Sequence, residues 1–314
     1  MNILYLDPNL NSQVYPYYTG LYSSLRENKS IRVKSYTKFN NSIDSIIKET
    51  SFNPDVIVLG LGWFGGFKYF SKISNLKNIP IVSFLFKPQN DMEDKINFCK
   101  INNVKLILSP APIFNEIYKR TNIKTKLFEY GCFIENFNCY NNLSKKFDIG
   151  FSGAMHNASL YPEGNFKNNN IRQKIQDILT KEENISTFWK GSDNFSKSRI
   201  DNYKDYSKTI NSCKIWLATL ASHGDVTPRY FEVLSSNTLL FCERPDESYN
   251  DILKDEINCV FFNSDLSDFE YKLKYYLNNE QKRLKIVKQS KKYHNNISWS
   301  SKAEKFINII KNNL

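Results

Sequence analysis

The stretch that decides the fold is SCKIWLATLASHGDVTPRYFEVLSSNTLLFCERPDESY, which spans residues 212–249. Its pattern predicts, in order, a β-strand, a polar loop, a helix and a second strand, at residues 214–220, 221–228, 229–236 and 238–242. A strand that ends in a polar loop and continues into a helix places that loop at the carboxyl edge of a parallel sheet. Ligands of open α/β folds bind at that edge, so the stretch also predicts where a functional site lies.

The expected helix begins with residues that suit an anionic ligand. Thr227 and Pro228 are a hydroxyl residue and a proline at the positions that favour a helix start. Arg229 and Glu232 are three residues apart and therefore share one face of the first turn. The N–H groups of a first turn attract phosphate, and a carboxylate accepts hydrogen bonds from ribose hydroxyls. The combination predicts a site for a nucleotide diphosphate.

Length and composition favour a two-domain protein. The chain has 314 residues, 41% of them hydrophobic and 15% aromatic, which is enough for two cores. No apolar run reaches about 18 residues, and residues 1–9 are typical of a first strand rather than of a signal peptide. Six scattered cysteines without a C-x-x-C pair favour buried free thiols over disulfides or a zinc site. We therefore expect a cytoplasmic protein.

The chain is basic, with 43 Lys and Arg against 32 Asp and Glu and a net charge of +11. Part of the excess lies at residues 281–295, which hold six basic residues and no acidic one. A solvated helix face explains this segment most simply, and peripheral contact with an anionic membrane at its inner face is the next interpretation. We expect no nucleic-acid partner, because no recognised DNA- or RNA-binding motif accompanies the charge.

Strands and helices alternate along the first half. The expected strands are residues 2–6, 31–36, 56–59, 81–86, 104–108 and 125–129. The expected helices between them are residues 18–26, 42–50, 91–102 and 113–120. This alternation predicts a parallel sheet with helices on both faces.

The alternation pauses at residues 131–146, which lack periodicity and are polar near their end, as in an interdomain linker. A new strand at 147–152 restarts it, and further elements are expected at 170–180, 185–189, 201–212, 258–262 and 266–277. We therefore predict two Rossmann-like domains, at residues 1–145 and 146–297, followed by a helix at 298–314. Trp299, Ala303, Phe306 and Ile310 form one apolar stripe of that helix.

The carboxyl half resembles a known family. Residues 147–153 (FDIGFSG) resemble the D-[IV]-x-F-x-G strand that opens its donor domain, and Arg229-Tyr230-Phe231-Glu232 resembles its R-x-F-E signature. Residues 258–262 and the helix around 275–277 resemble its closing section. The family is the nucleotide-sugar glycosyltransferases of the GT-B fold, with the group 1, spore-maturation-like branch the most similar. The resemblance covers about residues 125–310, and the amino half matches in architecture only.

The resemblance implies a metal-independent glycosyltransferase of the hexosyl type (EC 2.4), with no cofactor and a nucleotide sugar as substrate. It implies two Rossmann-like domains with a deep cleft between them and a C-terminal helix that crosses back over the junction. The donor would bind to the carboxyl domain. The acceptor, a glycan, a lipid-linked sugar or a protein, would bind to the amino domain.

Two departures from the family pattern leave an alternative open. Relatives carry an acid-x7-acid pair whose second member matches Glu232; its first member falls on Gly224, with Asp225 one residue late. The turn at residues 235–237 also lacks the usual glycine. A non-catalytic module that binds a nucleotide sugar or a glycan would tolerate both departures. A donor-hydrolysis assay would distinguish the two hypotheses.

Five residues are the candidates for donor binding. Glu232 would accept hydrogen bonds from the ribose, and Arg229 would either hold the diphosphate or form an ion pair with Glu232. Thr227 would contact the same group or only cap the helix. By the resemblance, Lys190 would neutralise the leaving diphosphate, as fixed cations do where no metal acts. Gly153 would let the backbone approach a phosphate closely.

Three residues are candidates for the base that takes the acceptor proton: His156, His223 and Asp225. Each histidine has an alternative structural or surface role. An inverting enzyme needs such a base, whereas a retaining one works without it, and the sequence leaves the stereochemistry open.

The acceptor candidates follow two strands of the amino half. Residues 60–66 (GLGWFGG) follow a buried strand, and Gly62 and Trp63 would form an acceptor loop with an aromatic ring for sugar stacking. Lys87 lies at the equivalent edge after the next strand. A dinucleotide fingerprint fits poorly, because no acidic residue lies about 20 positions further on. No metal-binding motif is present, and we expect no metal.

Overall fold

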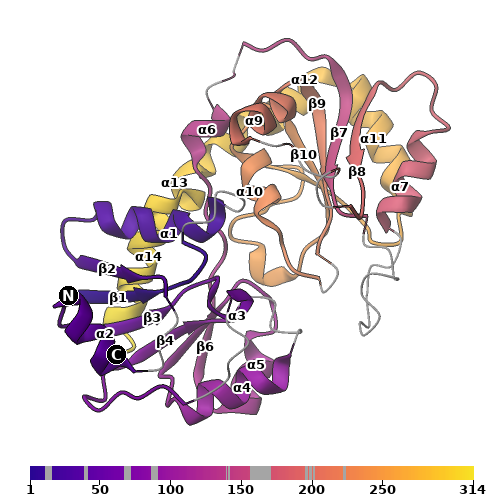
Figure 1. Ribbon diagram of the computed structural model, residues 1–314. Coiled ribbons are helices and arrows are strands. Elements are labelled where there is room, and N and C mark those ends of the chain that lie inside the picture. The colour runs from indigo at the N-terminus through magenta and orange to yellow at the C-terminus, as the bar shows by residue number, and fades with distance from the viewer. Residues whose placement is uncertain are drawn as a thin grey trace. The chain divides into compact units, whose positions relative to one another are not determined.

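The computed structural model describes residues 1–10, 16–38, 42–66, 72–85, 91–138, 140, 142–155, 171–194, 197, 200, 202–221 and 224–314. The chain divides into two compact units (Figure 1). The first consists of residues 1–131 with 299–314, and the second of residues 132–298. Each unit contains one parallel sheet, so the predicted pair of Rossmann-like sheets is confirmed.

The first sheet has six parallel strands in the order β2-β1-β3-β4-β5-β6. The strands are β1 (Asn2–Leu6), β2 (Arg32–Tyr36), β3 (Val56–Leu59), β4 (Ile81–Phe84), β5 (Leu106–Ser109) and β6 (Lys124–Leu127). In register, Leu4 of β1 lies between Lys34 and Ile57. The chain leaves β1 toward one side and returns at β3 on the other, so the strand order reverses between β1 and β3. Open α/β sheets bind ligands at such a switch point.

Helices cover both faces of the first sheet. The helices are α1 (Pro16–Glu27), α2 (Ile43–Thr50), α3 (Trp63–Gly66), α4 (Met92–Ile101), α5 (Phe114–Thr121) and α14 (Trp299–Lys311). Apolar side chains of α2, α4 and α5 form one core cluster with alternate strand residues. On the other face, α14 lies beside α1 (Figure 1), and Phe306 of α14 stacks on Phe84 of β4 at 5.8 Å between ring centroids.

The last helix is fastened to the first unit by a buried ion cluster. Glu129, just after β6, is 6% exposed and pairs with Lys302 at 3.0 Å and Lys305 at 2.7 Å. Burial raises the pKa of Glu129, but the charges of the two lysines outweigh burial, so that its pKa is lowered. The predicted apolar stripe of α14 is buried, with Phe306 fully covered. Packing of α14 across the domain junction stays a prediction.

The second sheet has five parallel strands in the order β11-β10-β9-β7-β8. The strands are β7 (Phe147–Gly153), β8 (Thr187–Gly191), β9 (Cys213–Ala218), β10 (Leu239–Glu243) and β11 (Val260–Phe262). Ile149 of β7 lies between Thr187 and Ile215. The order again reverses, here between β7 and β9, which places the second switch point at the carboxyl ends of these two strands.

Helices also cover both faces of the second sheet. They are α6 (Ile134–Asn138), α7 (Ile171–Leu179), α9 (Tyr203–Asn211), α10 (Pro228–Leu234), α11 (Phe269–Asn278), α12 (Glu280–Ser290) and α13 (His294–Ile297), with short 3-10 turns η2 (Glu247–Tyr249) and η3 (Lys291–Tyr293). Side chains of α7, α11 and α12 form a core cluster with Ile215 and Leu217 of β9. Trp216 lies between them in the strand and so points to the opposite face, where its ring meets Tyr206 of α9.

The division between the units falls at Gly131 rather than near Lys145. The intervening segment contains α6, whose Phe137 is fully buried against Tyr203 and Tyr206 of α9. The Lys145 ammonium donates to the carbonyl oxygens of Asn211 and Asn237 and so fastens the end of the segment to the second unit. Aromatic packing and these hydrogen bonds therefore make the expected linker part of that unit.

Two further expectations concern the chain as a whole. Five cysteines are free and buried, at positions 99, 132, 213, 242 and 259; Cys139 lies outside the described residues. In the part of the chain that the structure describes, no helix has both the length and the apolar character that crossing a membrane requires.

Candidate functional site

The candidate site lies at the switch point of the second sheet. Gly153 ends β7, residues 219–221 follow β9, and residues 224–227 lead into α10, which begins at Pro228. The described part of the deciding stretch thus contains the predicted strand, helix and second strand, as β9, α10 and β10. Because α10 has only seven residues, side chains rather than a long helix dipole must supply most of the chemistry.

Glu232 is a buried carboxylate held by two tyrosines. Its side chain lies on α10, and the residue is 8% exposed. Its Oε1 accepts a hydrogen bond from the Tyr203 hydroxyl and its Oε2 from the Tyr206 hydroxyl, both at 3.1 Å. Burial raises the pKa of Glu232, while the Arg229 charge and the two hydroxyls lower it only in part. A carboxylate offers about four lone-pair sites, so the two tyrosine hydroxyls do not use the full acceptor capacity of Glu232.

Arg229 is linked to Glu232 through a hydroxyl. Its Nε donates to the Tyr206 oxygen at 3.2 Å, and among the described residues no direct ion pair joins it to Glu232. Its guanidinium lies over Gly153, where an added Cβ would be 3.2 Å from both Nη atoms. Gly153 has a φ of 145°, which strains any other residue. The guanidinium fork thus faces bare backbone at the end of β7.

A second arginine, which the sequence did not single out, ties the two strand ends together. Arg172 of α7 is 4% exposed. Its Nε donates to the Thr219 hydroxyl at 2.6 Å, its Nη2 to the Leu220 carbonyl at 3.1 Å, and its Nη1 to the Ala154 carbonyl. These bonds join the loops that follow β7 and β9. No sequence signal distinguishes such an arginine from the many on helix surfaces.

The remaining donor candidates have mixed surroundings. Thr227 takes the N-cap position of α10, but its side chain makes no capping hydrogen bond, and its Oγ1 is buried without a partner among the described residues. Lys190 lies in β8 opposite Ser152 of β7 and is half-buried. It is therefore at the same sheet edge as Gly153, one strand further out.

The base candidates are described only in part. Asp225 is 8% exposed, and its carbonyl accepts from the Ala221 N–H at 2.8 Å. His156 and His223 lie outside the described residues. Gly224 has a φ of 84°, a left-handed conformation that glycine adopts without steric cost.

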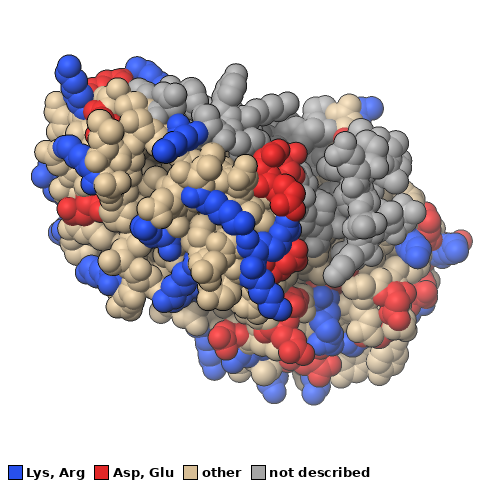
Figure 2. All heavy atoms as spheres, turned by 90° about the horizontal axis from the view of Figure 1, so that it is seen from below, with Lys and Arg blue, Asp and Glu red and all other residues tan. Residues whose placement is uncertain are grey.

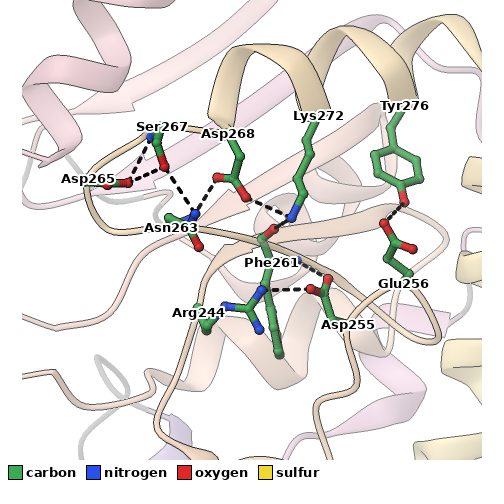
Figure 3. Close-up of polar contacts among 10 residues, drawn as sticks. All are labelled: Arg244, Asp255, Glu256, Phe261, Asn263, Asp265, Ser267, Asp268, Lys272 and Tyr276. Atoms are coloured by element: carbon green, nitrogen blue, oxygen red, sulfur yellow. Dashed lines mark hydrogen bonds and ion pairs between the residues drawn. The ribbon is translucent and has the colours of Figure 1, made fainter.

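The outer end of the same edge is closed by an internally paired network (Figure 3). Asp255 pairs with Arg244 at 3.0 Å and accepts from the Phe261 N–H at 2.8 Å. Lys272 pairs with Asp268 at 2.9 Å and donates to the Phe261 carbonyl at 2.8 Å. Asp268 and Lys272 are therefore paired with each other at the start of α11, and the half-exposed Arg244 is paired with Asp255.

The switch point of the first sheet also buries a carboxylate, one that the sequence analysis missed. Asp7 follows β1 directly and is fully buried. It accepts hydrogen bonds from the Gly62 N–H at 2.9 Å and the Asn9 N–H at 2.8 Å. Burial raises the pKa of Asp7 to about 6 despite these two bonds. An Asp after an apolar strand, with a G-x-G segment after the neighbouring strand, is the signal that could have found it.

Two of the acceptor candidates, Gly62 and Trp63, lie in a closely packed segment after β3. Gly62 lies against Asp7 and Asn9, and an added Cβ would be 2.3 Å from the Asp7 Oδ1. Trp63 is 3% exposed and packs near Phe98 in the core cluster. A ring this buried offers little surface for stacking a sugar. Lys87 lies outside the described residues.

The basic segment at 281–295 is amphipathic. Arg283 is buried and donates to the carbonyl oxygens of Tyr276 and Leu277, and Ile286 and Val287 pack in the core. Its exposed basic side chains are Lys282, Lys285, Lys288 and Lys292. On the face drawn in Figure 2, lysine and arginine lie beside aspartate and glutamate, so that face carries both signs.

Among the residues that the structure describes, no group of three His, Cys, Asp or Glu side chains could hold a metal ion.

Solved structures of low sequence identity share this architecture. HepE from Anabaena, in complex with UDP and glucose, aligns over 99% of this chain and 100% of its own, with 12% identity and a TM-score of 0.57. A glycosyltransferase from Rickettsia africae aligns over 99% and 98%, with 11% identity and a TM-score of 0.57. OtsA in its apo form aligns over 99% of both chains, with 10% identity and a TM-score of 0.61. The fold is therefore GT-B: two Rossmann-like units of one parallel sheet each.

A similarity to one protein family lies in the second unit and α14. Residues 172–308 match the family of proteins described as glycosyl transferase-like, a span that contains Lys190, Arg229 and Glu232. No curated protein sequence matches the chain significantly. The chain has the GT-B fold, and its second unit with most of α14 is similar to the glycosyl transferase-like family.

Proposed function

We propose that this protein transfers a sugar, of the hexose class, from a nucleotide-diphosphate donor bound at the carboxyl edge of the second sheet. The observation that carries the proposal is the joint placement of Glu232 and Arg229 at the switch point, with the glycine end of β7 against the guanidinium. A buried carboxylate and a guanidinium fork are the groups that recognise ribose hydroxyls and phosphate oxygens.

Each donor-site residue has a distinct proposed role. Glu232 accepts hydrogen bonds from the ribose, and Arg229 holds the diphosphate above Gly153. Lys190, at the end of the neighbouring strand, stabilises the charge that develops on the leaving diphosphate. The similar HepE structure contains UDP and glucose, which supports a uridine nucleotide as the first donor to test.

The acceptor side of the proposal rests on fewer observations. We place the acceptor, a glycan, a lipid-linked sugar or a protein, at the first unit's edge, where Gly62 and Lys87 follow adjacent strands. Asp225, His156 and His223 are the proposed candidates for the base. The exposed lysines of α12 would favour peripheral contact with an anionic membrane.

The test is a thermal-shift screen with UDP, GDP, ADP and TDP, followed by a hydrolysis and transfer assay with the matching nucleotide sugars. A ligand present at 100 times its dissociation constant raises the free energy of unfolding by about 2.7 kcal/mol. We expect a shift with one of these nucleotides and turnover of its sugar derivative. No shift with any of them would overturn the proposed site.

A second candidate function is a non-catalytic module that binds a nucleotide sugar or glycan. The observation that favours it is Gly224. This glycine has a left-handed backbone conformation and stands where the resembled family pattern has an acidic residue. Nucleotide binding without hydrolysis or transfer, across a panel of acceptors, would favour this candidate over the enzyme.

A further inference from the structure

Glu232 and Arg229 are neighbours on α10, yet the contacts that fix both side chains come from α9. Tyr203 and Tyr206 bind one carboxylate oxygen each. Tyr206 also accepts the Arg229 Nε–H. A tyrosine hydroxyl has one proton to donate, so the direction of this chain is fixed: Arg229 donates to Tyr206, and Tyr206 donates to Glu232.

The two tyrosine rings are themselves held on several sides. Phe137 of α6 meets the Tyr203 ring edge-to-face at 5.1 Å and the Tyr206 ring at 6.0 Å. Trp216 of β9 meets the Tyr206 ring edge-to-face at 6.1 Å. The Asn211 side chain of α9 donates to the Phe137 carbonyl at 3.0 Å, which joins α9 to α6. The hydroxyls are therefore presented from a packed aromatic layer with little rotational freedom.

We propose that Tyr203 and Tyr206 are the positioning residues of the donor site, and that Tyr206 couples ribose recognition by Glu232 to diphosphate recognition by Arg229. The proposal rests on the proposed function of these two residues. Because Nε is engaged by Tyr206, the guanidinium turns its two Nη atoms toward Gly153, where a phosphate would lie. The aromatic layer thus sets the distance between the two recognition groups before a ligand arrives.

The two tyrosines should affect different parts of the ligand, so their losses can be told apart by binding measurements. Tyr203 contacts the carboxylate alone, so its loss should weaken the nucleoside and the nucleoside diphosphate by the same factor. Tyr206 contacts both groups, so its loss should weaken the diphosphate by more than the nucleoside. A merely structural role would leave the ratio of the two affinities unchanged in the Tyr206 variant as well.

The hydroxyls also favour the ionised form of Glu232. The charged and titratable groups that face this carboxylate are Arg229 on its own helix, Tyr203 and Tyr206 from α9, and Cys132 before α6. Burial raises the pKa of the thiol and of both phenols, which therefore stay neutral near pH 7. Loss of either hydroxyl should raise the pKa of Glu232 further, and the acid limb of nucleotide affinity should move to higher pH.

The experiment measures UDP and uridine affinity by calorimetry across pH for Tyr203→Phe, Tyr206→Phe and Glu232→Ala, and for each tyrosine variant combined with Glu232→Ala. Tyr230→Phe is the matched control, since that buried hydroxyl donates to the Glu243 carbonyl instead. Melting curves check folding. We expect about tenfold weaker UDP binding in each tyrosine variant, a larger UDP-over-uridine loss only in Tyr206→Phe, and little further uridine loss in the Glu232→Ala background.

The outcomes separate the inference from the proposed function. Parental affinities and pH profiles in both tyrosine variants, beside a clear loss in Glu232→Ala, would overturn the positioning role and leave the donor site intact. Parental UDP affinity in Glu232→Ala itself would overturn the proposed function instead. If UDP does not bind the parent, the nucleotide that the thermal-shift screen identifies and its nucleoside replace UDP and uridine.

Discussion

The two sheets of this protein each bury carboxylates at the carboxyl edge, but they hold them with different partners. In the first unit, Asp7 accepts from the backbone N–H groups of Gly62 and Asn9. In the second, Glu232 is held by the hydroxyls of Tyr203 and Tyr206. Backbone partners fix the course of a loop, whereas hydroxyl partners on a separate helix orient a side chain.

The charges around these carboxylates differ in the same way. Glu129 of the first unit forms ion pairs with the buried Lys302 and the partly exposed Lys305, both on α14. Glu232 is linked through the Tyr206 hydroxyl to the guanidinium of Arg229, and the two Nη atoms of that guanidinium face Gly153. The comparison teaches that burial alone does not mark a binding site. A carboxylate with spare acceptor capacity, near a guanidinium that forms no ion pair among the described residues, is the better indication of such a site.

The largest expected effect belongs to the first unit. Glu129→Ala leaves the buried Lys302 without its counter-charge, and breaking a buried pair in this way costs about 3–5 kcal/mol of unfolding free energy. Denaturant unfolding measures this cost, and UDP affinity should not change. Glu116→Ala is the matched control, because that carboxylate forms an exposed pair with Arg120 and should cost at most about 1 kcal/mol. Equal costs in the two variants would remove the distinction.

The next effect is the pH dependence that Asp7 confers. Its pKa is raised from 3.8 to about 6, so the folded state binds this proton more tightly than the unfolded state. The stabilisation is complete below about pH 4 and is lost as pH rises through about 6, which amounts to on the order of 3 kcal/mol. Unfolding free energies at pH 4 and pH 7 should therefore diverge by this amount between the parent and Asp7→Asn, with the parent losing relative stability as pH rises. If the unfolding free energies of the parent and Asp7→Asn changed with pH in parallel, the pKa of Asp7 would not be raised in the folded state.

A smaller effect is expected from Lys190 in the second unit. Removal of one group that stabilises developing charge reduces turnover by about a hundredfold. Lys190→Ala should therefore lower kcat for the nucleotide sugar while UDP affinity changes little, because the charge on the leaving diphosphate is largest in the transition state. Lys282→Ala removes an exposed lysine of α12 and is the control. A loss confined to KM would assign Lys190 to ground-state binding.

The smallest of these effects concerns ligand discrimination by Arg229. Arg229→Ala should weaken UDP by about tenfold more than uridine, because only UDP presents oxygens to the guanidinium. Calorimetry with both ligands measures the ratio. An unchanged ratio would mean that Arg229 serves only to orient Tyr206.

Most of the fold could be predicted because local patterns agree with it. Continuous apolar runs such as Val56–Leu59 are buried parallel strands, as predicted, and the alternation of elements indicated two sheets. The segment at 131–146 was harder, since its short helix α6 is defined by burial of Phe137 rather than by any periodicity. Tertiary packing decides elements of this length.

The candidate site divides along the same line. The spacing of Arg229 and Glu232 indicated their shared edge, because three residues on a helix fix which side chains lie together. Their connection through Tyr206 could not be predicted. Tyr206 lies on α9, more than twenty residues earlier in the chain, and only the order of the strands in the folded sheet brings α9 next to α10. For Trp63, the position of an aromatic residue after a strand indicated a surface for sugar stacking. In the structure its ring is buried in the core instead.

The most direct test of the account is nucleotide binding by Glu232→Ala, measured by calorimetry on protein whose folding is verified by melting. If Glu232 accepts hydrogen bonds from the donor ribose, the variant should lose about 1.5–3 kcal/mol of affinity for the nucleotide that stabilises the parent. Glu129→Gln, which alters a buried carboxylate of the first unit, should bind that nucleotide like the parent. Parental affinity in Glu232→Ala would contradict the assignment of the second sheet's edge as the donor site.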